Sequence, residues 1–203
     1  MGRQASMSDR ARSPLWETRS RLRSFETLQA PLDETLAAAR AAGVKLNDIF
    51  VTAAARGVGA ALAELGALVV CGGLGGVMEA TAEGAAAAGG NVLGILPGAA
   101  VGAAAPGVSI PLPTDLGEAR NILVVRTSEA VIAIAGGWGT LSEAAFCLKL
   151  GVPLLGLRDT LPAALPIERV MDPEAAVRRA LELAAKRRTG PDPSAERSAG
   201  GVR

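Results

Sequence analysis

The sequence predicts an α/β fold: a doubly wound, three-layer, Rossmann-like parallel sheet with helices on both faces. Two observations predict it. Apolar runs of strand length, such as ALVVC (67–71) and AVIAIA (130–135), alternate with helical segments, and strands buried on both faces of a parallel sheet have this character. Two glycine-rich turns, GGLGG (72–76) and GGWGT (136–140), each lie between such a strand and a helix. Both turns therefore belong at the sheet edge where such folds bind ligands.

Composition favours a globular protein with an aliphatic core. Of the 203 residues, 49% are hydrophobic but only 2% are aromatic, so small aliphatic side chains must fill a core of closely spaced elements. The net charge of +1 gives no electrostatic reason to expect nucleic acid or an anionic membrane as a partner. We expect no metal site and no resident cofactor.

Cysteine usage and the N-terminus predict a cytoplasmic protein. Cys71 and Cys147 lie in apolar surroundings and make no disulfide framework, which is typical of buried free thiols in a reducing compartment. The arginine-rich N-terminus lacks the apolar core of a signal peptide. Glycines and prolines interrupt the uncharged stretch 84–114, whereas a membrane-spanning helix needs about 20 consecutive apolar residues.

The elements follow one another in a regular order. A helix is predicted at 31–43, because Pro31 stands near its start, acidic residues occupy its first turn and Gly43 stops it. From residue 67 onward, apolar runs alternate with helical periodicity, and the prolines of VSIPLP suit an edge strand or a loop. We predict strands at 67–71, 91–97, 108–113, 130–135 and 153–157, and helices at 77–89, 115–128, 140–151 and 173–188.

The segment between residues 44 and 66 has two interpretations. The run IFVT (49–52) could be a first strand that feeds a helix from Ala54 to Leu65. Alternatively, Asn47 and Asp48 begin a single helix that continues to Leu65. We favour the continuous helix, over about 48–65, because no glycine-rich turn follows IFVT. The first, central strand of the sheet would then be missing or replaced by a helix, which exposes backbone groups of the neighbouring strands.

Three segments result from this assignment. Residues 1–43 are predicted to be a disordered or helical extension, residues 44–188 a Rossmann-like nucleotide-binding domain, and residues 189–203 a disordered tail.

The turn GGWGT is suited to an anion. Glycine leaves no Cβ in the way of a ligand, and the helix N-terminus that follows offers N–H groups and the positive end of its dipole. No Lys-Ser/Thr follows the glycines, so this is not a triphosphate-binding loop, and GGLGGVM lacks the third glycine of a dinucleotide fingerprint. A single phosphate group is the better fit, and a tight turn without a ligand is the alternative.

Glu143 has two interpretations of similar weight. The run T-L-S-E from Thr140 to Glu143 has the spacing of a capping box, in which the carboxylate reaches back to the N–H of the capping residue. A carboxylate at this position also lies beside any phosphate or sugar bound in the turn.

Three stretches carry a resemblance to a known family. These are CGGLGGVMEATAEGAAAAGGNVLGILPG (71–98), GEARNILVV (117–125) and GGWGTLSEAAFCLKLGVPLLGL (136–157). Residues 58–185 resemble the LOG-type Rossmann proteins, long labelled "possible lysine decarboxylase", which include molybdenum cofactor carrier proteins. In the best-understood branch, the activity is hydrolysis of the base–ribose bond of a nucleoside 5′-monophosphate.

The resemblance implies roles for particular residues. Glu143 and Arg120 match the catalytic Glu and Arg of the family. The resemblance also implies a small phosphorylated, nucleotide-like ligand and a homodimer. A carboxylate stabilises the positive charge that develops on the ribose and orients water, while Arg120 holds the nucleotide or supports the leaving base. A solvated surface arginine is the alternative for Arg120, and a first-turn acid is the alternative for Glu79. The ligand-binding candidates are Gly136, Gly137, Gly139, Thr140, Gly72, Gly73, Gly75, Gly76, Glu79 and Asn121.

The chain departs from the family pattern in three places. Ala135 replaces the proline before the glycine turn, and Asn121 replaces the lysine of the hydrolytic branch. The opening strand is absent, and residues 31–62 instead resemble a fragment of the wax ester synthase/diacylglycerol acyltransferase family, whose paired catalytic histidines this chain lacks. Three functions stay open: a nucleotide-binding hydrolase, a carrier of a nucleotide-like cofactor such as the molybdenum cofactor, and an inactive fusion product.

Overall fold

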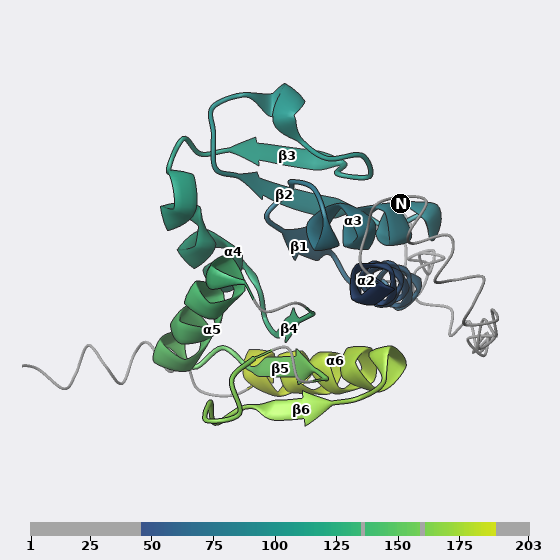
Figure 1. The fold of residues 1–203 in the computed structure, drawn as a ribbon, viewed down its shortest axis with the longest axis vertical. Coiled ribbons are helices and arrows are strands. Elements are labelled where there is room, and N and C mark those ends of the chain that lie inside the picture. The colour runs from purple at the N-terminus through teal and green to yellow at the C-terminus, as the bar shows by residue number, and fades with distance from the viewer. Residues whose placement is uncertain (1–45, 135–136, 159–160, 190–203) are drawn as a thin grey trace, which may run out of the picture.

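Two sheets of three parallel strands form the centre of the fold (Figure 1). The computed structural model describes residues 46–134, 137–158 and 161–189. The first sheet has the order β1-β2-β3 and the second has the order β4-β5-β6, and all four strand pairs are parallel. The strands are β1 (Val69–Cys71), β2 (Val92–Leu96), β3 (Ile110–Pro113), β4 (Val131–Ala133), β5 (Leu154–Leu157) and β6 (Glu168–Val170).

Helices flank the strands, and the predicted α/β class of parallel strands with flanking helices is confirmed. Glycines define several helix ends. Gly76, with φ 73°, precedes α3, and Gly151, with φ 70°, follows α5 in the left-handed conformation typical of this position. The helices are α2 (Leu46–Glu64), α3 (Val77–Ala87), α4 (Asn121–Thr127), α5 (Trp138–Leu150) and α6 (Pro173–Thr189), with short 3-10 helices η2 (Val101–Ala103) and η3 (Gly117–Arg120).

The segment that had two interpretations is one continuous helix. Because α2 runs from Leu46 to Glu64, residues 49–52 form no strand. Close packing of α2 on α3 supports the helix: a Cβ on Gly59 would overlap the backbone of Thr81, and a Cβ on Gly84 would overlap the backbone of Arg56. Helix packing therefore outweighs the strand propensity of IFVT.

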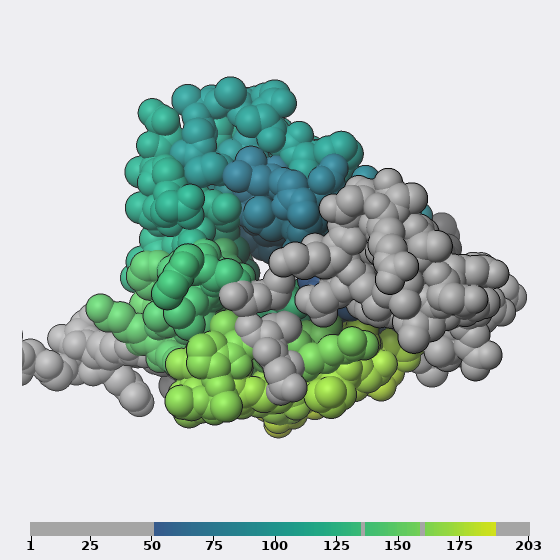
Figure 2. Space-filling view, viewed as in Figure 1, coloured from purple at the N-terminus to yellow at the C-terminus, as the bar shows by residue number. Residues whose placement is uncertain are grey.

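The space between β1 and β4 contains no paired strand among the described residues. Val69 N–H donates to Asn91 O at 3.1 Å, and Val131 N–H donates to Pro153 O at 2.9 Å. Since backbone groups alternate in direction along a strand, those of Val70 and Ile132 point toward this space. Both residues are partly exposed, and the surface is hollowed between the parts built around the two sheets (Figure 2). The prediction of a helix in place of a strand at 49–52 is confirmed, and within the described residues no strand lies between β1 and β4.

The outer and inner edges of the sheets differ in composition. The outer strand β3 contains Pro111 and Pro113, and the outer strand β6 contains Glu168 and Arg169. Prolines and charges protect a sheet edge against further pairing. The inner strands β1 (VVC) and β4 (VIA) contain neither, so their sequences are those of interior strands.

Three apolar clusters form the core. The first, around Val58 and Val177, joins α2, α3 and α6 to β4 and β5. The second, around Cys147 and Leu154, packs α5 against β4 and β5. The third, around Val92, packs α3 against β1 and β2. Both cysteines are buried free thiols, as predicted.

Some predicted boundaries were wrong. The strand β6 was not predicted, because the run IERV follows a proline-rich connection and has two adjacent charged residues between its apolar ones, without the alternation typical of a strand. The single helix predicted at 115–128 is divided into η3 and α4. The predicted helix at 31–43 and nearly all of the predicted tail at 189–203 lie outside the described residues. Within the described residues, no helix combines the length and hydrophobicity needed to cross a membrane.

Candidate functional site

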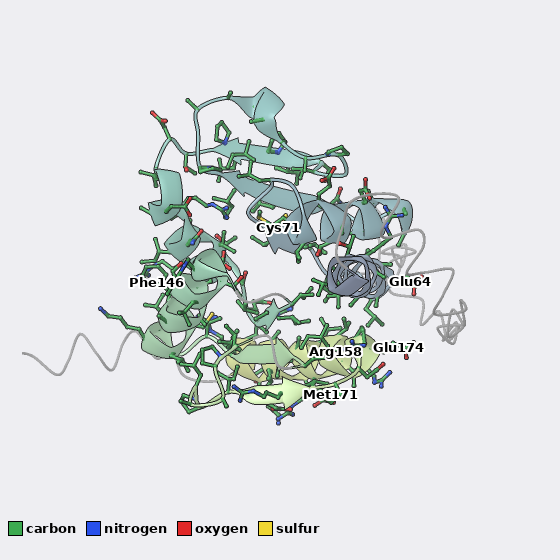
Figure 3. The ribbon with its side chains drawn as sticks, viewed as in Figure 1. Glu64, Cys71, Phe146, Arg158, Met171 and Glu174 are labelled. Atoms are coloured by element: carbon green, nitrogen blue, oxygen red, sulfur yellow. The ribbon has the colours of Figure 1, made fainter. Side chains whose placement is uncertain are left out.

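The candidate site lies where β1 ends, where η3 leads into α4, and where α5 begins. Cys71 is the last residue of β1 and lies in the interior of the molecule (Figure 3). Arg120 ends η3, and Glu143 lies on α5. Their charges act on one another and on the Cys71 thiol. The structure thus brings together the two residues that the sequence singled out for catalysis.

Arg120 is buried, so its interpretation as a solvated surface arginine is wrong. The residue is only 6% exposed, and its Nε and Nη1 atoms have no hydrogen-bond partner among the described residues. Nη2 donates to the thioether of Met78 at 3.9 Å, which is a weak acceptor. Leaving charged donors buried without acceptors is costly, so these two atoms need a structural or functional explanation.

The first glycine turn shapes this arrangement. Gly72 lies directly against the Arg120 guanidinium, and any Cβ there would overlap it. Gly73, with φ 70°, is packed against Leu96, whose Cδ2 would lie 2.6 Å from an added Cβ. Both glycines are buried and lie against protein atoms, and their contact with a sugar and base stays a prediction. Gly75 and Gly76 are exposed and leave the surface open.

Glu143 is not part of a capping box. The helix α5 begins at Trp138 with Gly137 as the capping residue, and no side chain caps it. Glu143 therefore lies in the second turn, out of reach of the cap. The helix starts early because Gly137 adopts an extended conformation and its carbonyl already accepts the Leu141 N–H at 3.0 Å. The capping interpretation of Glu143 is thereby removed.

The carboxyl group of Glu143 is partly buried and electrostatically coupled to its neighbours. Burial raises its pKa above the ordinary value of 4.5, the positive charge of Arg120 opposes that rise, and the negative charge of Glu118 adds to it. No ion pair joins Glu143 to Arg120 within the described residues. A carboxyl group with a raised pKa next to a fixed positive charge is a candidate for proton transfer.

Asn121 connects α4 to the beginning of α5. Its amide nitrogen donates to Ser142 Oγ at 2.8 Å and to Gly139 O at 3.4 Å, and Ser142 Oγ donates to the same carbonyl at 2.7 Å. The buried amide group is therefore engaged in holding the two helices together. This role places Arg120, the residue before Asn121, opposite α5.

The start of α5 is open to an anion. Gly137 is exposed, and a Cβ built on it would meet nothing within 4 Å. Gly139 is also exposed, and Thr140 is partly exposed. The first N–H groups of a helix have no partner within the helix, so those of α5 are available for an anion. Gly136 lies outside the described residues.

The remaining candidates have other surroundings. Glu79 lies in the first turn of α3, in agreement with its alternative interpretation as a first-turn acid. Burial raises the pKa of the Cys71 thiol, and it raises the pKa of the Cys147 thiol to about 12. The negative charge of Glu143 adds to the rise in both pKa values.

Sequence reasoning missed Met78, Ser142 and Glu118 as neighbours of the site. Of these three, only Glu118 could have been found from the sequence, because it lies two residues before Arg120 in GEARN (117–121).

Parallel strands flanked by helices, with glycine turns at helix starts, define a Rossmann-like α/β protein. The chain belongs to the SLOG cluster4 family (LDcluster4), whose family model matches residues 43–184. This confirms the predicted LOG-type relationship. The comparisons give no support to the wax ester synthase resemblance of residues 31–62.

Known proteins similar to the chain include molybdenum cofactor proteins. It is 31% identical to the molybdenum cofactor binding protein from the phototrophic bacterium Rippkaea orientalis, over 66% of this chain and 87% of that one, with a TM-score of 0.61. It is 28% identical to the molybdenum cofactor carrier protein from Chlamydomonas reinhardtii, over 67% and 89%, with a TM-score of 0.59. An uncharacterised protein of Archaeoglobus fulgidus is 41% identical over 121 residues, which are 59% of this chain and 78% of that protein.

Proposed function

We propose that the chain binds a small phosphorylated, nucleotide-like ligand at the carboxyl ends of β1 and β4. The phosphate group lies at the start of α5, against Gly137, Gly139 and Thr140. The observation that carries the proposal is the buried guanidinium of Arg120, which lies near the carboxyl group of Glu143 and the open start of α5. Its Nε and Nη1 lack acceptors among the described residues. A ligand with both a phosphate and further acceptor groups would satisfy both features.

Hydrolysis of the base–ribose bond is the finer proposal for this site. Water would add across the N-glycosidic bond of a nucleoside 5′-monophosphate, its oxygen to C1′ of the ribose and a proton to the base. The products are free base and ribose 5-phosphate. Glu143 in its ionised form would accept the proton of water and stabilise positive charge on the ribose, and Arg120 would support the leaving base.

A carrier function is the second candidate, in which the same site holds a nucleotide-like cofactor such as the molybdenum cofactor as cargo. The names of the similar solved structures favour it, as do Ala135 and Asn121 in place of the proline and lysine of the hydrolytic branch. A homodimer is part of both proposals, by resemblance to the family.

Product analysis separates the two candidates. Purified protein is incubated with a panel of nucleoside 5′-monophosphates, and free base and ribose 5-phosphate are measured by chromatography. A hydrolase releases both products from at least one nucleotide, and Glu143→Gln abolishes release while the far-ultraviolet circular dichroism spectrum is unchanged. Tight binding without release across the panel supports the carrier function instead.

A further inference from the structure

The space between β1 and β4, here called the slot, has backbone hydrogen-bonding groups on both of its edges. The N–H groups of Val70 and Ile132 point into it, and neither has a backbone partner there among the residues that the structure describes. Both residues are only partly exposed, and backbone groups removed from water are almost always paired in folded proteins. What fills the slot must therefore carry backbone donors and acceptors at the spacing of a strand.

Helices lie on both faces of the slot. The helix α2 packs against both α3 and α6, and its Leu62 contacts the apolar clusters of both sheets (Figure 1). Ile132 belongs to the cluster with α2 and α6, whereas Ala133 belongs to the cluster with α5. Because adjacent strand residues point to opposite faces, α5 lies on the other face, where Asn121 joins it to α4, which contacts β1. The slot thus has a strand on each edge and a helix on each face.

The walls of the slot are apolar. Neither β1 (VVC) nor β4 (VIA) contains a charged residue, and the buried charge of Arg120 lies against Gly72, beyond the last residue of β1. The partly buried α2 residues packed at the cluster with β4 are Val51, Ala54, Ala61 and Leu62. Burying an unpaired charge is costly, and strands covered on both faces are rich in valine and isoleucine. The slot therefore fits uncharged, apolar side chains, above all β-branched ones.

The terminal segments of the chain do not have this character. Each of β1 and β4 contains two adjacent β-branched residues, whereas neither residues 1–45 nor residues 190–203 contain such a pair. A second copy of the chain has the same sequence, and its strands β1 to β6 are those already used in its own two sheets. The occupant that fits the slot is therefore a strand from a different polypeptide.

We propose that the slot receives an extended strand from a partner polypeptide, parallel to β1 and β4 and hydrogen-bonded to both. The inserted residues are uncharged and β-branched. In recognition by strand addition, main-chain hydrogen bonds give affinity and the pockets for alternate side chains give specificity. The inference does not depend on the proposed function, because it concerns the backbone groups between the sheets and not the start of α5.

Hydrogen exchange followed by nuclear magnetic resonance, on the full-length protein, tests the inference with a synthetic peptide. The probe is the capped peptide Gly-Ser-Val-Ile-Val-Ser-Gly, whose three apolar residues match the length of β1 and β4. Isothermal titration calorimetry first gives its dissociation constant. With free peptide at about ten times that constant, exchange at both Val70 and Ile132 should slow about tenfold, because only the unoccupied slot exposes these amides.

Two controls separate the slot from unspecific binding. The peptide Gly-Ser-Val-Pro-Val-Ser-Gly lacks the central N–H group, so it should slow neither amide. Val70→Pro removes the N–H group that points into the slot, and this group takes no part in the pairing of β1 with β2. Proline is tolerated at such edge positions, so the variant should fold but lose the peptide binding that Val70→Ala retains.

Several outcomes overturn the inference. These are a peptide that does not bind, slowing at only one of the two amides, and equal slowing by the proline peptide. Protection of both amides before any peptide is added overturns it in favour of a segment of this chain, and protection that grows with protein concentration overturns it in favour of a second copy. If circular dichroism shows that Val70→Pro does not fold, the comparison of the two peptides decides. Anion binding at the start of α5 is measured separately, so none of these outcomes removes the proposed function.

Discussion

The guanidinium group of Arg120 fills the space beside Gly72 that a side chain at position 72 would need. A Cβ at that position would overlap Nη1, Nη2 and Cζ of Arg120. Arg120 comes from η3, and Gly72 follows β1, 48 residues earlier in the chain. The first glycine turn, which the sequence analysis predicted to contact the ligand, thus packs against Arg120 of the candidate site.

Gly72→Ala should displace the Arg120 guanidinium without unfolding the protein, because the overlapping atoms are the end of a flexible side chain. We expect nucleotide affinity to fall about tenfold or more, the value of one lost charge-assisted contact of roughly 1.5–3 kcal/mol. Calorimetric titration measures this loss. Gly98→Ala is the control, since Gly98 is not among the candidate ligand-binding residues and its Cβ would meet nothing within 4 Å; an equal loss in both variants contradicts the role of Gly72.

Glu143→Gln should change how stability depends on pH. Burial raises the pKa of Glu143 in the folded state above its ordinary 4.5, so between these two pKa values the folded state holds a proton that the unfolded chain has released. The free energy of unfolding contributed by this group is therefore greatest below pH 4.5 and decreases as pH rises through the folded pKa. Glutamine does not titrate, so the variant should lose this decrease and be more stable than wild type at pH 7.

Urea denaturation at several pH values measures the effect. Glu64→Gln, which changes an exposed acid, serves as the control and should retain the wild-type slope. A variant at Glu143 that loses stability at pH 7 would show that its charge is stabilising, contrary to the direction of its pKa.

Gly137→Val should remove anion binding while preserving the fold. The backbone of Gly137 is extended, at φ −89° and ψ 178°, which valine adopts readily, and its Cβ would meet no protein atom within 4 Å. Phosphate should raise the melting temperature of the wild-type protein by binding only the folded state. The same phosphate shift in Gly137→Val would mean that the anion binds elsewhere.

The inner sheet edges should be visible in hydrogen exchange. The amide groups of Val70 and Ile132 point toward the space between β1 and β4, and neither has a backbone partner there within residues 46–134, 137–158 and 161–189. We expect these two amides to exchange at least about tenfold faster than that of Leu155, which lies in the central strand of the second sheet. Equal protection in nuclear magnetic resonance exchange experiments would mean that another segment pairs with these edges.

Much of the fold could be predicted because local patterns agree with the tertiary structure. The apolar runs that became β2 and β5 are almost wholly buried and those that became β1 and β4 are partly buried, and glycines mark the start or end of α3 and α5. The continuous helix α2 was favoured because no glycine turn follows residue 52. The strand β6 was not predicted, because Glu168 and Arg169 suit an exposed sheet edge, where apolar periodicity is weak.

The site was harder to predict than the fold. Glu143 could not be assigned from its spacing, because the capping box and the catalytic role require the same residue type, and only the start of α5 at Trp138 separated them. The burial of Arg120 depends on the absence of a side chain at Gly72, a contact between distant segments that periodicity does not encode. The hydrogen bond from Asn121 to Ser142 also joins segments that are distant in the sequence, so local patterns do not predict it.

Native mass spectrometry of freshly purified protein tests the proposed ligand binding most directly. The wild-type protein should carry an additional mass that is released on denaturation and identified as a phosphorylated, nucleotide-like compound, or should acquire such a mass when a nucleoside 5′-monophosphate is added. Gly137→Val should carry less of it under the same conditions. Wild-type protein that shows only the polypeptide mass, both as purified and after addition of each nucleotide, would contradict the proposal that this site binds such a ligand.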